Sequence, residues 1–237
     1  MESNYSKFVD SMSARYPTLT ALARFLKPGS QNPVHASSIR AIDIDRNGAA
    51  NQTRDMKLAE LLHHIKNHAT SQQASGVVVL LEDPGPVDIE KLGVALDINP
   101  LFFGGHVATA YEDVEKQPPP PIMTMFPSHG ATQDFIHIHC QKVVDLGEER
   151  LFRGTPYKLI VPGNIPRQVR LMQALSGRQL GLLRMCTSVL FKRLSHNTWI
   201  GMSLSTTYFQ NGVVNVKVIY LSRLSTSRLF YKRHHRE

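Results

Sequence analysis

Residues 76–103 read GVVVLLEDPGPVDIEKLGVALDINPLFF, and this stretch decides the fold class. It begins with five consecutive apolar residues after a glycine, three of them valine. Such an unbroken run predicts a strand buried on both faces. Pro84 and Pro86 cannot donate backbone hydrogen bonds, so the strand is expected to end near Glu82 and Asp83.

Two helices are predicted after this turn. Asp88 and Glu90 fit the N-terminal end of the first helix, where negative charge is favourable. Asn99 is a suitable N-cap for the second, with Pro100 in its first turn. The stretch therefore predicts a strand–helix–helix unit of an α/β domain. It contains no nucleophile, no phosphate-binding glycine loop and no metal-spaced cluster, so these residues alone indicate no reaction.

The same stretch carries a family resemblance. Residues 77–107, VVVLLEDPGPVDIEKLGVALDINPLFFGGHV, resemble the N-terminal cytosolic domain of fungal CorA-like divalent metal cation (magnesium) transporter proteins. The matching positions are Glu82, Asp83, Ile98, Pro100, Phe102, Phe103 and His106. Weaker agreement lies at residues 42–45, 180–184 and 199–201.

The resemblance implies a fold and a domain division. The expected fold is α/β, a mixed β-sheet flanked by helices in the α/β/α arrangement of the CorA-like cytosolic domain. This domain is expected over residues 1–205. Residues 206–237 have no match and read as a basic C-terminal extension in place of the pore region. The residues that carry the resemblance are packing signatures, so they indicate fold more than activity.

The chain lacks the membrane helices of such transporters. No window approaches the roughly 18 consecutive apolar residues that a spanning helix needs, and Arg184 interrupts the best candidate, residues 180–191. Gly201 and Met202 are followed by Ser203 and do not reproduce the family's Gly-Met-Asn signature. We therefore expect a soluble protein that forms no pore. Its start resembles no signal peptide, and two cysteines suit a reducing compartment, so the expected location is cytoplasmic.

Hydrophobic periodicity and residues that end helices or strands predict further elements. Helices are expected at residues 16–26 and after Asp55, which is a plausible cap for a helix with a buried stripe of Leu58, Leu61, Leu62 and Ile65. Strands are expected at residues 38–45, 135–144, 157–161, 180–191, 198–204 and 213–221. A parallel pair is expected early in the chain and antiparallel strands later. Residues 111–133, with four consecutive prolines, read as a surface loop.

Positive charge is concentrated at one end. The net charge is +8, and residues 164–237 contain twelve Lys or Arg but one acidic residue, Glu237. The simplest interpretation is a solvated surface. The functional alternative is a basic surface for nucleic acid or anionic lipid, acting through residues 164–237. Sparse aromatic residues and the absence of an RNA-binding signature argue against nucleic acid.

Histidines offer a second alternative. His137 and His139 point to the same side of a strand and could share a metal, which would make the protein a metal-dependent enzyme. No acidic residue follows at the expected spacing, so the simpler interpretation is a polar strand face whose other face is Ile136, Ile138 and Cys140. Cys140 and Cys186 both lie in apolar strand contexts and read as small hydrophobes.

Two further sets of polar residues have simple explanations. His64 and His68 stand one helical turn apart, but the zinc-protease pattern is absent, so exposed helix polarity is the preferred interpretation. Glu82 and Asp83 lie at the C-terminal end of a strand and could hold a weakly bound divalent cation such as magnesium. Capping and loop solubility explain them with nothing further and are the preferred interpretation.

The sequence thus predicts a non-catalytic domain that acts through protein association or regulation. In CorA relatives this domain assembles around a symmetry axis, so the resemblance implies self-association or association with a related full-length protein. No catalytic, cofactor-binding or metal-ligating residue is assigned at this stage.

Overall fold

The computed structural model describes residues 5–27, 36–70, 76–108, 134–161 and 163–205. Its helices are α1 (Tyr5–Ser13), α2 (Thr20–Leu26), α3 (Leu58–Thr70), α4 (Pro86–Ala95) and α5 (Pro100–Val107), with short 3₁₀ turns η1 (Pro17–Leu19) and η2 (Glu149–Phe152). Its strands are β1 (Ser38–Ile44), β2 (Arg54–Asp55), β3 (Gly76–Glu82), β4 (Phe135–Glu148), β5 (Lys158–Val161), β6 (Arg167–Leu171), β7 (Arg178–Arg193) and β8 (Trp199–Ser205).

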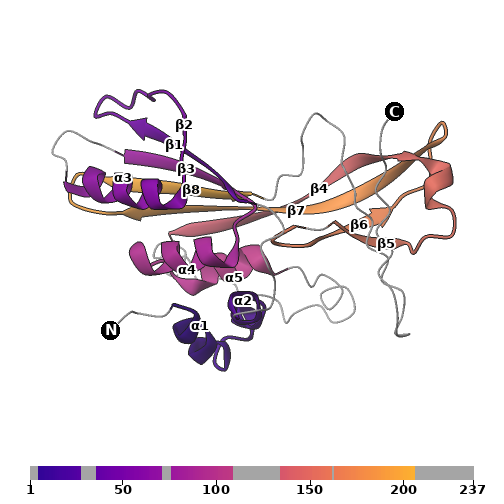
Figure 1. The fold of residues 1–237 in the computed structure, drawn as a ribbon, viewed down its shortest axis with the longest axis horizontal. Coiled ribbons are helices and arrows are strands. Elements are labelled where there is room, and N and C mark those ends of the chain that lie inside the picture. Colours follow the sequence, from indigo (N-terminus) through magenta and orange to yellow (C-terminus); the bar gives the residue numbers. More distant parts are fainter. Residues whose placement is uncertain (1–4, 28–35, 71–75, 109–133, 162, 206–237) are drawn as a thin grey trace, which may run out of the picture.

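All eight strands belong to one mixed sheet, so the predicted α/β fold is confirmed. The strand order is β2-β1-β3-β8-β7-β6-β5. β4 lies outside this order and pairs with β7 (Figure 1). Among the described pairs, β3 and β8 alone run parallel. The expected parallel pair early in the chain is therefore wrong, because β3 pairs antiparallel with β1 and takes its parallel neighbour from residues 199–205.

The strand–helix–helix unit forms as its residues predict. β3 ends at Glu82, and α4 starts at Pro86 after Gly85, whose N–H donates to Asp88 Oδ2 at 2.8 Å. Asn99 caps α5 by accepting a hydrogen bond from the Leu101 N–H at 3.0 Å. Both helix starts thus satisfy backbone donors that the helix itself leaves unpaired.

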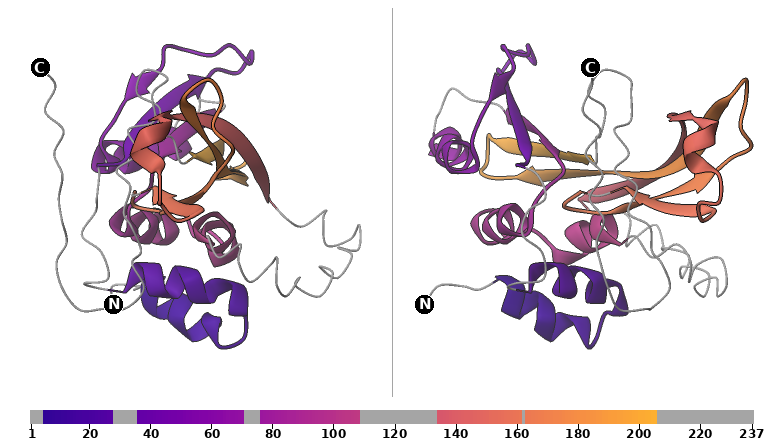
Figure 2. Two further views of the ribbon diagram at one scale, coloured as in Figure 1. Left: turned by 90° about the vertical axis from the view of Figure 1, so that its right-hand side faces the viewer. Right: turned by 45° about the vertical axis from the view of Figure 1, so that its right-hand side comes forward.

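The helices of the described chain pack on one face of the sheet. The largest buried cluster joins residues of all five helices to one set of alternating strand positions: Ile39 and Ala41 of β1, Val77, Val79 and Leu81 of β3, Ile200, Met202 and Leu204 of β8, Leu190 of β7 and Phe135 of β4. Figures 1 and 2 show α4 and α5 against the sheet, with α1 and α2 outside them. The three-layer arrangement expected from the resemblance is not seen in the described residues, since no described helix covers the other face.

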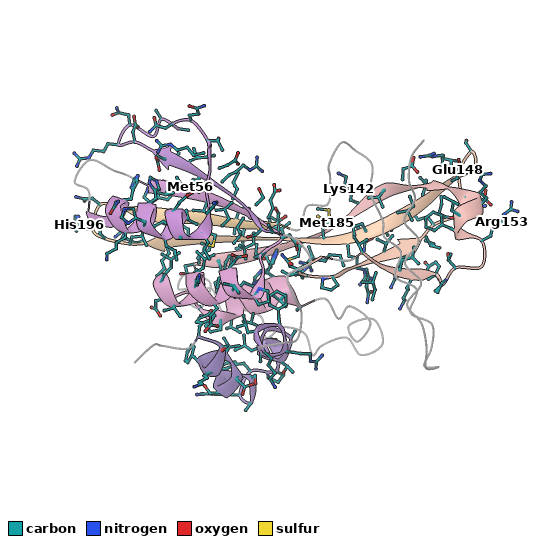
Figure 3. The ribbon with its side chains drawn as sticks, viewed as in Figure 1. Met56, Lys142, Glu148, Arg153, Met185 and His196 are labelled. Carbon is teal, nitrogen blue, oxygen red and sulfur yellow. The ribbon has the colours of Figure 1, made fainter. Side chains whose placement is uncertain are left out.

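The sheet continues beyond the helices as an arm. β4, β5, β6 and β7 extend away from them, and Figure 3 shows Glu148 and Arg153 at the far end. The arm has its own small core, made of Val144, Leu146, Phe152, Leu159, Val161, Val169 and Leu183. Leu183 and Leu190 are an odd number of residues apart in β7, so the two cores lie on opposite faces of that strand.

Some elements differ from the prediction. α1 and β6 were not predicted, and Asp55 lies in β2 rather than capping α3, where the Lys57 N–H donates to Glu60 Oε2 instead. The predicted loop at 111–133, the predicted strand at 213–221 and the proposed extension 206–237 lie outside the described residues. Within the described residues, no helix has both the length and the apolar character to span a bilayer.

Candidate functional site

The acidic turn after β3 is used by the protein itself. Asp83 is buried, and its carboxylate accepts hydrogen bonds from the N–H groups of Asn164, at 3.1 Å, and Ile165, at 3.3 Å. Glu82 pairs with Arg40 of β1 at 2.7 Å. These contacts join the turn to the segment before β6 and to the edge of the sheet. The geometry therefore favours a structural role over the magnesium site considered from sequence.

His137 points toward the helices, contrary to the expected polar outer face. Its Nδ1 lies 2.7 Å from Ser188 Oγ, and Nδ1 of His106 lies 2.9 Å from the same oxygen. His106 and Ser188 are completely buried between α5 and β7. The other side of β4 is the exposed one, with Ile136 58% and Ile138 50% accessible. The prediction had the two faces of this strand reversed, because alternation gives the period but not which face is covered.

The hydrogen-bond network fixes the tautomers of the two buried rings. His137 also hydrogen bonds the backbone of Leu101, which leaves its Nδ1 to accept from the Ser188 hydroxyl. The hydroxyl has one proton, so Nδ1 of His106 must donate to Ser188 Oγ. Arg167 is buried beside them and donates to the His106 carbonyl at 2.9 Å. The cluster is a packed polar core in which Nε2 of His106 is buried with no hydrogen-bond partner among the described residues.

The geometry does not favour catalysis at this cluster. Ser188 Oγ has histidine partners, but the residue has no exposed surface, so a substrate could reach it only if α5 moved away. Cys186 Sγ lies 3.6 Å from Ser188 Oγ, and burial raises the pKa of this thiol, which disfavours the reactive thiolate. His139 lies beside His137 with ring centroids 6.5 Å apart, and no carboxylate of the described residues joins them in a group spaced for a metal.

Burial makes these histidines sensitive to acid. Burial, followed by the positive charge of Arg167, holds the pKa of His106 well below its ordinary value of 6.5. The pKa values of His137 and His139 are lowered too, with burial as the largest cause. In the unfolded chain the His106 ring binds a proton near pH 6.5, whereas in the folded protein its lowered pKa keeps it neutral there.

We therefore expect the free energy of unfolding to fall as the pH drops below about 6.5, with His106 contributing up to about 1.4 kcal/mol per pH unit. Urea titrations between pH 7.5 and pH 5 measure this slope. His106→Asn should make it shallower, and His196→Asn, in an exposed turn, should leave it unchanged. A stability that does not change over this range would contradict the buried, neutral state of His106.

The basic residues of the second half do not gather into one patch in the described part. Arg167 is buried, Arg178 bonds Asp145 at the arm, and Lys192 lies 3.6 Å from an Asp97 carboxylate oxygen. Arg170, Arg184 and Arg193 are the other described members, and the remaining six of the twelve lie in residues 206–237, outside the described chain.

The helix-free face of the sheet is apolar. Strand register places two largely apolar rows across its middle: Leu80, Ser203, Val189 and Ile136 in one, with Arg40 at the β1 end, and Ile42, Val78, Gly201 and Phe191 in the other. Phe191 is 53% exposed, and its ring centroid lies 5.2 Å from that of Trp199. Where one face of a sheet lies in water, the side chains on that face are usually polar. This face therefore has the composition of a contact surface.

Gly76 shapes the same face. A Cβ atom at this position would lie 2.2 Å from the Trp199 ring, so the absence of a side chain lets the indole lie directly on β3. The ring then lies beside that of Phe191, with an angle of 30° between the two ring planes. Nearby charge is balanced at the rim by the Arg40–Glu82 ion pair. We call the residues of these two rows, with Trp199 and Ile138, the open sheet face.

His64 and His68 are not simply exposed helix polarity. Both rings point from α3 toward Asp43 of β1, and their side chains are 21% and 12% exposed. Asp43 was not linked to the two histidines from sequence, although the alternating apolar and acidic residues at 42–45 indicate a strand. In the same way, Ser188 and Arg167 belong to no local sequence motif, since their partners are distant in sequence.

Neither a protein-family model nor a curated protein matches this chain, and the relation to CorA-like transporters stays a prediction.

Proposed function

We propose that this chain is a non-catalytic association domain that pairs with a second copy of itself through the open sheet face. The proposal includes a cytoplasmic location, in keeping with its two free cysteines. The observation that carries it is the apolar composition of a sheet face that no described helix covers. Leaving such a face in water is unfavourable, and contiguous exposed apolar surface is typical of protein interaction sites.

The sequence of β3 supports the same conclusion. Its unbroken apolar run is the pattern of a strand buried on both faces. Val77, Val79 and Leu81 are completely buried under the helices, whereas Val78 and Leu80 on the other side are only half-buried. The composition of the strand thus fits a second covering layer, which a partner would provide.

A second copy is the occupant that the surface chemistry favours. In a two-fold symmetric pair each patch meets its own equivalent, so an apolar and nearly neutral patch is complementary to itself. The Arg40–Glu82 pair neutralises its two charges within one chain, which leaves Arg193, opposite Trp199, as a single positive charge at one end of the face. A nucleic acid or an anionic membrane would require a positive surface here. Two such faces would pack as a β-sandwich, about 10 Å apart.

Sedimentation equilibrium tests this proposal. We expect the wild-type chain to form a dimer, and Ile138→Asp and Phe191→Asp to weaken its association by at least about 30-fold, as for residues at the centre of an interface. Both side chains are half-exposed, so both variants should fold, which circular dichroism checks. Val87→Asp is the matched control, because Val87 is 58% exposed but lies on α4.

Two outcomes would overturn the proposal. One is a wild-type chain that remains monomeric at all concentrations, which would mean that another segment or another protein covers the face. The other is a dimer that Val87→Asp weakens as much as Phe191→Asp does, which would place the contact on the helical side.

A further inference from the structure

Three potential metal ligands from two elements meet at the edge of the helix-covered face. His64 Nε2 lies 2.7 Å from Asp43 Oδ1, and His68 Nε2 lies 3.5 Å from the same oxygen. One ligand atom from each residue lies within 4.8 Å of those of the other two. Within the described chain this is the one group of His, Cys, Asp and Glu side chains spaced to hold an ion.

The fold explains why these residues meet. Asp43 alternates with Ile42 and Ile44, and it shares the helix-covered side of β1 with buried Ala41. His64 and His68 are four residues apart in α3, so they lie one above the other on one helix face. Leu61 and Ile65 bury the adjacent stripe of α3 in the core and so hold both rings over β1.

We propose that Asp43, His64 and His68 bind a divalent transition-metal ion, with zinc as the preferred ion. Two imidazoles and one carboxylate are a donor set that Zn²⁺ and its first-row neighbours bind in proteins. Magnesium prefers oxygen ligands and would bind poorly to the two nitrogens. Three protein ligands leave at least one coordination position for water or for a ligand from solution.

The surroundings support this assignment. Arg54 Nη2 lies 3.4 Å from Asp43 Oδ2, so it occupies the second carboxylate oxygen and leaves Oδ1 directed at the histidines. Such outer contacts orient ligands in known metal sites. His68 Nδ1 is buried and has no hydrogen-bond partner among the described residues. The other nitrogen of this ring, Nε2, faces Asp43 Oδ1 and is the one that would bind the ion.

Binding would join α3 to β1 across the edge of the sheet. The site lies on the covered face, whereas the proposed dimer contact lies on the open sheet face, so the two proposals are independent. Because the ion would bind the folded chain and not the unfolded one, it should raise the thermal midpoint of unfolding.

The test is a zinc titration of metal-free protein purified without a histidine tag. Competition with a chromophoric zinc chelator should show one tightly bound ion per chain. His64→Gln and His68→Gln should each weaken binding by at least about 100-fold, since loss of an outer partner alone weakens it 10–100-fold. Substituting Co²⁺ for zinc should give the visible absorption of a nitrogen-containing, low-coordinate site, and both variants should lose it.

His63→Gln is the matched control. His63 is the adjacent histidine of the same helix, and it bonds Asn67 on the exposed side. This variant should keep the wild-type affinity and the zinc-dependent rise in thermal midpoint. The proposal is overturned if zinc does not bind, or if His63→Gln weakens binding as much as His68→Gln while both variants remain folded.

Discussion

Replacing Phe102 with alanine is expected to lower the free energy of unfolding by about 3–5 kcal/mol. Phe102 has no exposed surface and lies where α5 meets the sheet. Its ring centroid is 5.1 Å from that of Phe103, 5.8 Å from that of Phe135 and 6.2 Å from that of His137. Truncation would remove these contacts and leave a cavity that the packed rings around it could fill only in part.

Urea denaturation at a fixed protein concentration measures this effect, since association would make stability depend on concentration. Val87→Ala on exposed helix surface is the control and should change stability by less than about 0.5 kcal/mol. A Phe102→Ala variant as stable as the control would mean that α5 does not pack on β4 and β7 as described.

Ser188→Ala should be the second most damaging change, with a loss of about 2–4 kcal/mol. The Ser188 hydroxyl is the shared partner of the buried His106 ring, at 2.9 Å, and the half-buried His137 ring, at 2.7 Å. Without it, one ring nitrogen would be a buried donor and the other a buried acceptor with no partner. Each unsatisfied group is unfavourable by about 1–3 kcal/mol.

Ser203→Ala provides the comparison for this experiment. Ser203 lies on the neighbouring strand β8 but belongs to the open sheet face, so its truncation should change stability by less than about 1 kcal/mol. If Ser188→Ala is equally mild, the imidazoles must find other partners such as water, and Ser188 would not be the shared partner that holds both rings in place.

Local signals predicted the central unit well. The prolines after β3, the acidic start of α4 and the Asn99 cap are decided by residues close in sequence, and each forms as expected. The α/β class followed from them. The pairing of β3 with β8 could not be predicted in this way, because parallel partners are chosen by contacts across more than a hundred residues.

The candidate sites were harder to predict for the same reason. His137 and His139 were found as a pair, but the face of β4 that the helices cover depends on α5, which is distant in sequence. His64 and His68 were recognised as neighbours on a helix, and the missing information was the position of Asp43 on the strand before it. The apolar run of β3 did indicate burial on two sides. The described helices cover only one side of β3, and the other side belongs to the open sheet face.

The most direct test of association through the open sheet face uses the native cysteines. Cys140 is exposed and lies on the same side of β4 as Ile136 and Ile138, which belong to that face. Cys186 is buried and its pKa is raised, so a spin label should attach to Cys140 alone. Pulsed electron paramagnetic resonance should then detect a defined distance between two labelled chains, lost on mixing with excess unlabelled protein and absent in Phe191→Asp. A wild-type sample without this signal, at a concentration where it sediments as a dimer, would contradict face-to-face pairing.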